Sequence, residues 1–373
     1  MIIGTPKEIK NQEYRVGLIP ANVKTFINKG HQVLIEKDAG MGSGFTNEEY
    51  VEAGATIVDT AEEIFAKAEM VIKVKEPQKV EYEQLREDQI LFTYLHLAPD
   101  RDQTKGLMDS GCIAIAYETI TDNDGRLPLL GPMSEVAGRM SIQVGAHWLQ
   151  RTKGGLGLLL GGVPGVAPAE VMILGGGIVG MNAAKMAVGL GAQVTIFETS
   201  VDRMRYIDDV FGARVTCLMS NEYNISKHLE HTDLVIGGVL IPGANAPKLI
   251  SRHQIENNMK AGSVIVDVAV DQGGCIETTR PTTHDDPTFQ VGEVTQYCVA
   301  NMPGAVPRTS TFALTNVTLP YALFIANNGV IDAIRRNHHL RNGVNTFQGK
   351  MTYEAVAQDQ NLKYADINEL IRR

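Results

Sequence analysis

The stretch VMILGGGIVG, residues 171–180, decides the fold of the chain around it. An apolar run typical of a buried strand leads into Gly175, Gly177 and Gly180, which fit the spacing G-x-G-x-x-G. Gly175 permits a tight turn, Gly177 lets the backbone approach a pyrophosphate, and Gly180 lets the next helix pack on the strand. That helix, Ile178 to Leu190, would offer free N–H groups and a positive dipole end to phosphates. The stretch therefore predicts a dinucleotide site on a Rossmann-type turn.

The next predicted strand begins at Val194 and ends at Glu198, which bears on the choice of cofactor. An acid there can accept hydrogen bonds from the adenosine ribose hydroxyls and would repel the additional phosphate of NADP, so we expect NAD. Arg203 and Arg205 lie nearby and weaken this choice, because an Arg can accommodate a 2′-phosphate. The alternative interpretation is a glycine turn between packed elements and a solvated surface Glu.

Strand and helix patterns alternate on both sides of the glycine turn, which indicates parallel sheets covered by helices. Strands are predicted on the N-terminal side at Ile2–Ile3, Val33–Glu36, Thr56–Val58, Met70–Lys75, Ile90–Leu95 and Cys112–Ala116, and on the C-terminal side at Arg214–Cys217, Leu234–Ile236 and Val264–Val268. Helices are predicted at Pro20–Lys29, Asn47–Ala53 and Ala61–Ala68, and the C-terminal ones at Ser310–Ala326 (with a kink at Pro320), Thr352–Ala357 and Ile367–Arg372.

A long helix is predicted from Glu135 to Arg151 with Ser134 as its N-cap, and it separates the two blocks. We expect the C-terminal tail to pack back on the first block. The predicted fold is therefore α/β with two doubly wound parallel-sheet domains. A Rossmann NAD domain at 135–304 is inserted into a discontinuous substrate domain at 1–134 and 305–373.

Composition excludes several classes of function. The chain has 34 Lys and Arg against 43 Asp and Glu, a net charge of -9 with no basic block, which argues against nucleic-acid binding. Its four cysteines form no C-x-x-C pair, so we expect free thiols in a reducing compartment and no metal.

No basic region followed by an apolar run marks a secretory signal at the N-terminus. The most apolar stretch, Gly154 to Pro168, is shorter than the roughly 20 residues that span a bilayer. We interpret it as a buried or subunit-facing loop and expect a cytoplasmic protein that does not contact membranes.

Three polar residues follow predicted strands, where ligands of open parallel sheets bind. Lys75 follows Met70–Val74 and His96 follows Ile90–Leu95, and both side chains reach the same edge if these strands are parallel neighbours. Asp271 follows Val264–Val268 and is expected to face a nicotinamide across a cleft. Each has a plain alternative: Lys75 or Lys73 as a surface lysine, His96 as a structural hydrogen-bonding group, and Asp271 as part of a turn with Gly273 and Gly274. Arg15 could likewise be a surface charge.

Taken together, the chain resembles the alanine dehydrogenase family over nearly its whole length. The resemblance is carried by Gly4-Thr5-Pro6-Lys7-Glu8, Glu13-Tyr14-Arg15-Val16, Val74-Lys75-Glu76-Pro77, Leu95-His96-Leu97, the run from Pro132 to Gly138, the glycine turn, Asp271-Gln272-Gly273-Gly274 and the run from Val299 to Pro303. The related nicotinamide nucleotide transhydrogenase α subunits share the start and the glycine turn. This chain departs from the family by Glu198 in place of the usual Asp, and by Arg203 where Lys is common.

The resemblance implies that Arg15 and Lys75 bind the substrate carboxylate and carbonyl, and that His96 and Asp271 are the catalytic pair. It implies NAD contacts from the glycine turn and from Ser134, Glu198, Arg203, Ser220, Val239, Leu240, Val268, Ala269, Val270, Asp271, Arg280, Val299, Ala300, Asn301 and Met302. The implied reaction converts L-alanine, water and NAD into pyruvate, ammonium and NADH, and the implied assembly is a homohexamer. The alternatives are a transhydrogenase-like NAD(H)-binding subunit and a non-catalytic protein that senses NADH.

Overall fold

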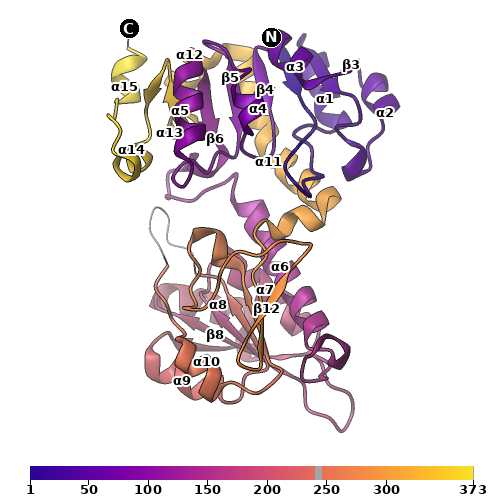
Figure 1. The fold of residues 1–373 in the computed structure, drawn as a ribbon, viewed down its shortest axis with the longest axis vertical. Coiled ribbons are helices and arrows are strands. Elements are labelled where there is room, and N and C mark those ends of the chain that lie inside the picture. Colours follow the sequence, from indigo (N-terminus) through magenta and orange to yellow (C-terminus); the bar gives the residue numbers. More distant parts are fainter. Residues whose placement is uncertain (240–245, 373) are drawn as a thin grey trace. The chain divides into compact units, whose positions relative to one another are not determined.

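The computed structural model describes residues 1–239 and 246–372, which form two compact units. The first unit joins Met1–Met133 to Val306–Arg373, and the second is Ser134–Ala305. Figure 1 shows that the N-terminal strands and the C-terminal helices belong to the same unit. Each unit is a sheet with helices packed on it, so the predicted α/β fold is confirmed.

The first unit is built on an eight-stranded sheet in the order β15-β14-β6-β5-β4-β1-β2-β3. Strands β1 to β6 are all parallel, and β14 pairs antiparallel with both β6 and β15. The antiparallel edge was not predicted. The strand bounds are β1 Ile2–Thr5, β2 Gln32–Glu36, β3 Thr56–Val58, β4 Met70–Ile72, β5 Ile90–Thr93, β6 Ile113–Ala116, β14 Val344–Phe347 and β15 Lys350–Met351.

The second unit is built on a seven-stranded sheet in the order β12-β13-β11-β10-β7-β8-β9. All of its neighbouring pairs are parallel except β12 with β13. The order reverses between β7 and β10, which is the topological switch point of a doubly wound sheet. The strand bounds are β7 Glu170–Leu174, β8 Gln193–Glu198, β9 Thr216–Met219, β10 Leu234–Gly237, β11 Val264–Asp267, β12 Thr288–Val291 and β13 Val294–Tyr297.

The central strands are apolar because both faces of each sheet are covered. Every residue of β5, β6, β10 and β11 is buried. Several of the flanking helices begin at good capping residues; α2, for example, has a capping box of Thr46 and Glu49. The helix bounds are α1 Pro20–Asn28, α2 Asn47–Glu52, α3 Ala61–Lys67, α4 Lys79–Tyr82, α5 Arg101–Ser110, α6 Gly131–Trp148, α7 Ile178–Gly189, α8 Val201–Phe211, α9 Glu222–Leu229, α10 Arg252–Asn258, α11 Pro307–Asn328, α12 Val330–Arg336, α13 His338–Asn342, α14 Glu354–Gln360 and α15 Ile367–Leu370.

Two local predictions need correction. Helix α6 starts at Gly131, so Ser134 lies in its first turn and is not its N-cap. The physical reason is Pro132, since proline is well suited to the start of a helix. The loop Gly154–Pro168 is not buried within its unit, because Leu159 and Val166 are 66% and 61% exposed. The subunit-facing interpretation of that loop stays a prediction.

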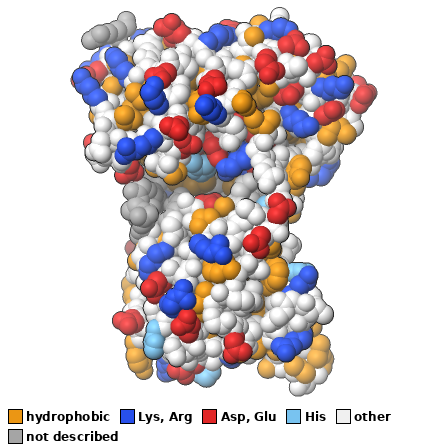
Figure 2. All heavy atoms as spheres, viewed as in Figure 1, with side chains coloured by type: hydrophobic (Ala, Val, Ile, Leu, Met, Phe, Trp, Pro, Cys, Tyr) orange, Lys and Arg blue, Asp and Glu red, His pale blue; other side chains and the backbone are white. Residues whose placement is uncertain are grey.

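On the visible face, Lys and Arg side chains are interspersed with Asp and Glu over both units (Figure 2). Among the described residues, no single helix has both the length and the apolar composition needed to cross a bilayer. Helices α11 and α12 reach that length and composition only when they are taken together, and they are bent by 119° relative to each other. Helix α11 continues through Pro320.

Candidate functional site

The glycine turn of the second unit joins β7 to α7, and each of its glycines has a physical reason. Gly175 adopts the left-handed region with φ of 90°, which favours glycine. A Cβ on Gly180 would lie 1.8 Å from the carbonyl oxygen of Gly175, so only glycine allows this helix to pack so close. A Cβ on Gly177, in contrast, would meet nothing within 4 Å. The turn therefore leaves open space beside Gly177, where a pyrophosphate could approach.

Helix α7 begins immediately after Gly177, which is its N-cap and supplies no side-chain cap. The N–H groups of the first helical turn are the ones that lack intrahelical partners, and with the helix dipole they suit an anion. Open space, a left-handed glycine and a helix N-terminus at the switch point together fit a dinucleotide.

Glu198 ends β8 and lies directly against the glycine turn. Its Oε2 accepts the N–H of Gly176 at 2.8 Å, and its Oε1 accepts the N–H groups of Thr199 and Ser200 at 2.7 and 3.0 Å. Burial opposes ionisation here, but these three donors prevail and lower the pKa of Glu198. Glu198 is therefore a fixed carboxylate, which can accept further hydrogen bonds from ribose hydroxyls.

The two arginines near Glu198 are both engaged. Arg203 donates from Nε to the carbonyl of Gly176 at 2.5 Å, so Glu198 and Arg203 both contact the backbone of Gly176 in the turn. Arg205 forms an exposed ion pair with Asp202 at 2.7 Å. Ser220, just past β9, donates its backbone N–H to the carbonyl of Glu198 at 2.9 Å. Of the predicted cofactor residues, the structure thus gathers Glu198, Arg203 and Ser220 around the turn.

A second loop of this unit follows β11 and carries Asp271. Residues Val268–Gln272 form a short 3-10 helix that ends at Gly273 in the left-handed conformation, so the segment does turn at its glycines, which is compatible with either interpretation of Asp271. Oδ2 of Asp271, an exposed residue, accepts the backbone N–H of Asn301 at 3.4 Å. The predicted loop Val299–Met302 therefore lies beside the predicted catalytic acid.

Asp267, the last residue of β11, holds this loop through hydrogen bonds, and the sequence analysis did not single it out. It is fully buried and accepts hydrogen bonds from the backbone N–H groups of Ala269 and Cys275 and from the hydroxyl of Thr279. Burial raises the pKa of Asp267, and these donors oppose the rise. An acid at a strand end directly before a predicted site loop was a signal that could have identified it.

The other predicted cofactor residues are less closely grouped. Val239 faces the glycine turn, because its Cγ2 would lie 3.0 Å from a Cβ on Gly175. Arg280 is exposed and its guanidinium stacks on the ring of Phe289 at 4.3 Å. Leu240 lies outside the described residues. Among the described residues, no group of three or more His, Cys, Asp and Glu side chains could hold a metal ion.

The first unit presents Lys75 and His96 beyond the carboxyl ends of the parallel neighbours β4 and β5. Nζ of Lys75 lies 3.6 Å from Oε2 of Glu76, whose other oxygen pairs with Lys10. Burial of the Glu76 carboxyl by itself would raise its pKa, but Lys75, Lys10 and His96 together lower the pKa of Glu76. The structure thus brings Lys75 and His96 to the same edge of the sheet.

Arg15 is only 2% exposed, so its interpretation as a surface charge is wrong. Its Nε and Nη2 donate to the two oxygens of Glu13 at 2.7 and 2.6 Å. Burial raises the pKa of the Tyr94 hydroxyl, and the nearby positive charge of Arg15 opposes this rise. The ring of Tyr94 stacks against the ring of His96. Glu13 thus occupies one edge of the guanidinium, and Nη1 donates to Sδ of Met133 at 3.1 Å.

Sequence reasoning missed the buried charges beneath this site. Lys73 is fully buried between Glu8 at 3.1 Å and Glu81 at 2.6 Å, so the surface-lysine interpretation is wrong for it. Burial alone would lower the pKa of Lys73, but the two carboxylates raise it, so it is a buried cation. Lys75 is 8% exposed and is not a surface lysine either.

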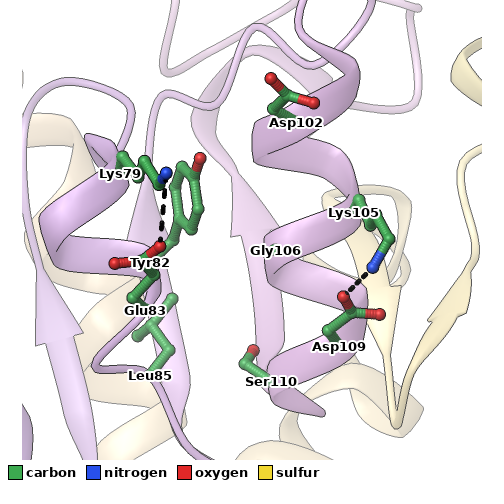
Figure 3. A pocket seen from close by; sticks show the side chains of 9 residues that line it. All are labelled: Lys79, Tyr82, Glu83, Leu85, Asp102, Lys105, Gly106, Asp109 and Ser110. Carbon is green, nitrogen blue, oxygen red and sulfur yellow. Dashed lines mark hydrogen bonds and ion pairs between the residues drawn. The ribbon is translucent and has the colours of Figure 1, made fainter.

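A cavity of about 530 Å³ lies between α4 and α5 (Figure 3), and none of the predicted site residues lines it. Among its lining charges, Lys79 pairs with Glu83 and Lys105 pairs with Asp109. Tyr82 packs over Gly106, where a Cβ would lie 2.4 Å from the ring. The chemistry of the strand ends, rather than this cavity, marks the candidate site.

Comparison with known proteins agrees with this geometry. The N-terminal and C-terminal domain models of the alanine dehydrogenase/PNT family match residues 4–137 and 141–354. The alanine dehydrogenase of Methanococcus maripaludis is 60% identical over 98% of both chains, and that of Bacillus subtilis is 55% identical over 100% of this chain and 98% of its own. The alanine dehydrogenase of Mycolicibacterium smegmatis is 50% identical over 100% of both.

Solved structures give the same result. An L-alanine dehydrogenase structure superposes with a TM-score of 0.94 at 53% identity, covering 97% of this chain and 99% of that one. A transhydrogenase from Sinorhizobium meliloti superposes with a TM-score of 0.81 at 23% identity over 95% and 100% of the two chains. The second likeness concerns the fold alone.

Proposed function

This chain belongs to the alanine dehydrogenase/PNT family, and from that membership we propose that it catalyses the reversible, NAD-dependent oxidative deamination of L-alanine to pyruvate and ammonium. The observation that carries the proposal is identity of 50 to 60% with alanine dehydrogenases over 98 to 100% of this chain. The geometry supports it with a dinucleotide turn on one unit and a cluster of Arg15, Lys75 and His96 on the other.

The glycine turn and Glu198 would hold NAD, which when bound accepts the hydride from the substrate α-carbon. The carboxylate of Glu198 would accept hydrogen bonds from the ribose and repel the charge of a 2′-phosphate. Arg203 donates to Gly176 and thereby stabilises the same turn. These contacts support NAD over NADP.

In the first unit, Arg15 would orient the substrate through its carboxylate, since guanidinium and carboxylate form strong charge-assisted hydrogen bonds. Lys75 would place its positive charge beside the carbonyl oxygen of pyruvate in the amination direction. The ammonium group lies 3.6 Å from Glu76, which keeps a negative charge beside it.

His96 would move the protons of the hydrolytic half-reaction. Loss of hydride from alanine leaves an iminium, water adds to its carbon, and ammonia departs as the carbonyl forms. Imidazole, with a reference pKa of about 6.5, can both take the proton of the water and give one to the leaving amine. Asp271 would help to activate the water or stabilise the cationic intermediate.

The test is the formation of NADH from L-alanine and NAD by wild type and by His96→Ala. We expect the variant to lose about 10²- to 10⁴-fold in kcat while its Kd for NADH stays within a factor of about two. Near-normal turnover by the variant would remove His96 from the mechanism. Hydride exchange between two nicotinamide nucleotides without alanine would instead favour a transhydrogenase subunit. The hexamer and the cytoplasmic location stay predictions.

A further inference from the structure

His96 has an unusual backbone. Its φ is 49°, in the left-handed region that residues with a side chain rarely adopt. Such a conformation costs of order 1–3 kcal/mol and persists only where surrounding contacts impose it. The question is therefore which contacts hold the backbone of a proposed catalytic residue in this conformation.

Glu118 supplies the main contact. Its Oε1 accepts the backbone N–H of His96 at 2.6 Å and that of Leu95 at 3.1 Å. The backbone pairing of β5 with β6 ends at Thr93 and Ala116. Beyond that point, the side chain of Glu118 takes the place of a backbone acceptor for the chain that follows β5. From the other side, the amide of Gln103 donates to the carbonyl of Leu95 at 3.0 Å.

The imidazole is guided by a second contact. The rings of Tyr94 and His96 stack with centroids 5.8 Å apart and planes inclined by 13°. Tyr94 is itself fixed, because its hydroxyl donates to the carbonyl of Leu129 at 2.7 Å. Glu118 thus holds the backbone of His96, and the ring of Tyr94 lies beside the exposed imidazole.

We propose that Glu118 is a positioning residue for His96, which acts by holding the left-handed backbone and thereby aims the imidazole at the substrate. This inference rests on the proposed function of His96. Two further glutamates support it by making the same contact at the other two proposed substrate residues. Oε1 of Glu8 accepts the N–H of Lys75 at 3.3 Å, and Oε1 of Glu13 accepts that of Arg15 at 3.1 Å.

The carboxylate acts here as an acceptor and not through its charge, so an amide should replace it. In Glu118→Gln, the side-chain oxygen can take the position of Oε1 and accept both N–H groups. In Glu118→Leu, the two N–H groups lose this acceptor and nothing opposes relaxation of His96 out of the left-handed region. The pair of variants therefore separates position from charge.

We expect Glu118→Leu to lower kcat for L-alanine about 10- to 100-fold, as for a misplaced catalytic group, with the KM for NAD within about twofold of wild type. Glu118→Gln should keep kcat within about fivefold and leave the pH dependence of kcat unchanged. If Glu118→Leu does not fold, Glu118→Asp serves instead, because the shorter side chain cannot reach both N–H groups.

The matched control is Glu69→Leu. Glu69 also accepts a backbone N–H, that of Ile2 at 2.6 Å, but at the amino end of the same sheet. We expect no change in kcat from its removal. Wild-type kcat in Glu118→Leu, or equal losses with a shifted pH profile in Glu118→Gln, would overturn the positioning role. His96→Ala measured in parallel separates this failure from that of the proposed function: an inactive His96→Ala beside a fully active Glu118→Leu overturns the positioning role alone, whereas an active His96→Ala contradicts the role of His96 on which the positioning role rests.

Discussion

The two sheets have the same parallel core order, β3-β2-β1-β4-β5-β6 in one unit and β9-β8-β7-β10-β11-β13 in the other, yet their switch points are built from different material. In the second unit the turn after β7 is made of glycines, and its N–H groups are the ones proposed to meet the cofactor. In the first unit the segments after β1 and β4 carry the buried charges Glu8, Arg15, Lys73 and Lys75, and the segment after β5 carries the exposed His96.

The difference shows that topology sets where a ligand binds, whereas the residues set which ligand. Backbone N–H groups suit a diphosphate, which needs several donors but little discrimination. A small amino acid offers only a few atoms, so it needs side chains in fixed positions. Fixing them requires partners, and a glutamate contacts the backbone or side chain of each of Arg15, Lys73, Lys75 and His96.

The largest effect is expected where the first unit depends on a buried charge. Lys73→Met would leave Glu8 and Glu81 buried without their shared cation, which should cost about 3–5 kcal/mol in the free energy of unfolding. Urea unfolding at fixed protein concentration measures it. Lys67→Met is the control, because the exposed pair Lys67–Glu63 contributes at most about 1 kcal/mol.

The same variant has a pH signature. Burial already raises the pKa of Glu8, and loss of Lys73 would raise it further. A carboxyl whose folded pKa exceeds its unfolded value loses stability as pH rises through that window, beginning near about 4.3. Lys73→Met should therefore lose less stability relative to wild type at pH 5 than at pH 8. An equal loss at both values would contradict the proposed dependence of the Glu8 carboxylate on Lys73.

An intermediate effect is expected in the second unit, where glycines replace charges. Gly180→Ala would force its methyl group against the carbonyl of Gly175, and should cost at least about 1–3 kcal/mol in the free energy of unfolding. Gly177→Ala has room for its methyl group and an ordinary φ of -70°, so it should change stability by less than about 1 kcal/mol.

For cofactor binding we single out Gly177→Ala, the variant with the smaller expected loss of stability. The Gly177 methyl group would fill the space proposed for the pyrophosphate, so Gly177→Ala should weaken NADH binding by at least about tenfold, equivalent to about 1.4 kcal/mol. Quenching or enhancement of NADH fluorescence on titration measures it. A folded Gly177→Ala that binds NADH as wild type does would refute the role of the open space.

The smallest effect concerns specificity. Glu198→Gln should reduce the preference for NAD over NADP, in the ratio of kcat/KM values, by about tenfold, because the repelling charge is gone while an acceptor oxygen remains. Asp202→Asn, an exposed change one turn away, is the control.

Backbone donors lower the pKa of Glu198, so its carboxylate contributes to stability above about pH 4.3, and this contribution is lost in wild type as the pH falls. The contribution should be missing in Glu198→Gln.

Much of the fold could be predicted from local pattern. Strand β3 has the predicted bounds, and α7 differs from its prediction by one residue. The helices and strands that were missed, including α5, α8, β12 and β14, are short, polar or at a sheet edge. Helix α8 did have a readable signal, since Ser200 is its N-cap and Ile207 and Phe211 form its buried stripe.

By itself, the sequence determined the glycine turn, the two α/β blocks and the strand ends that carry Lys75, His96 and Asp271, because these depend on short-range spacing and apolar periodicity. Only the tertiary structure decided that Arg15 and Lys73 are buried and that Glu8, Glu13 and Glu118 hold the backbones of the proposed substrate residues. Glu8 and Glu118 meet residues 67 and 22 positions away in the chain. The register of a folded sheet, which no local pattern contains, brings those partners together.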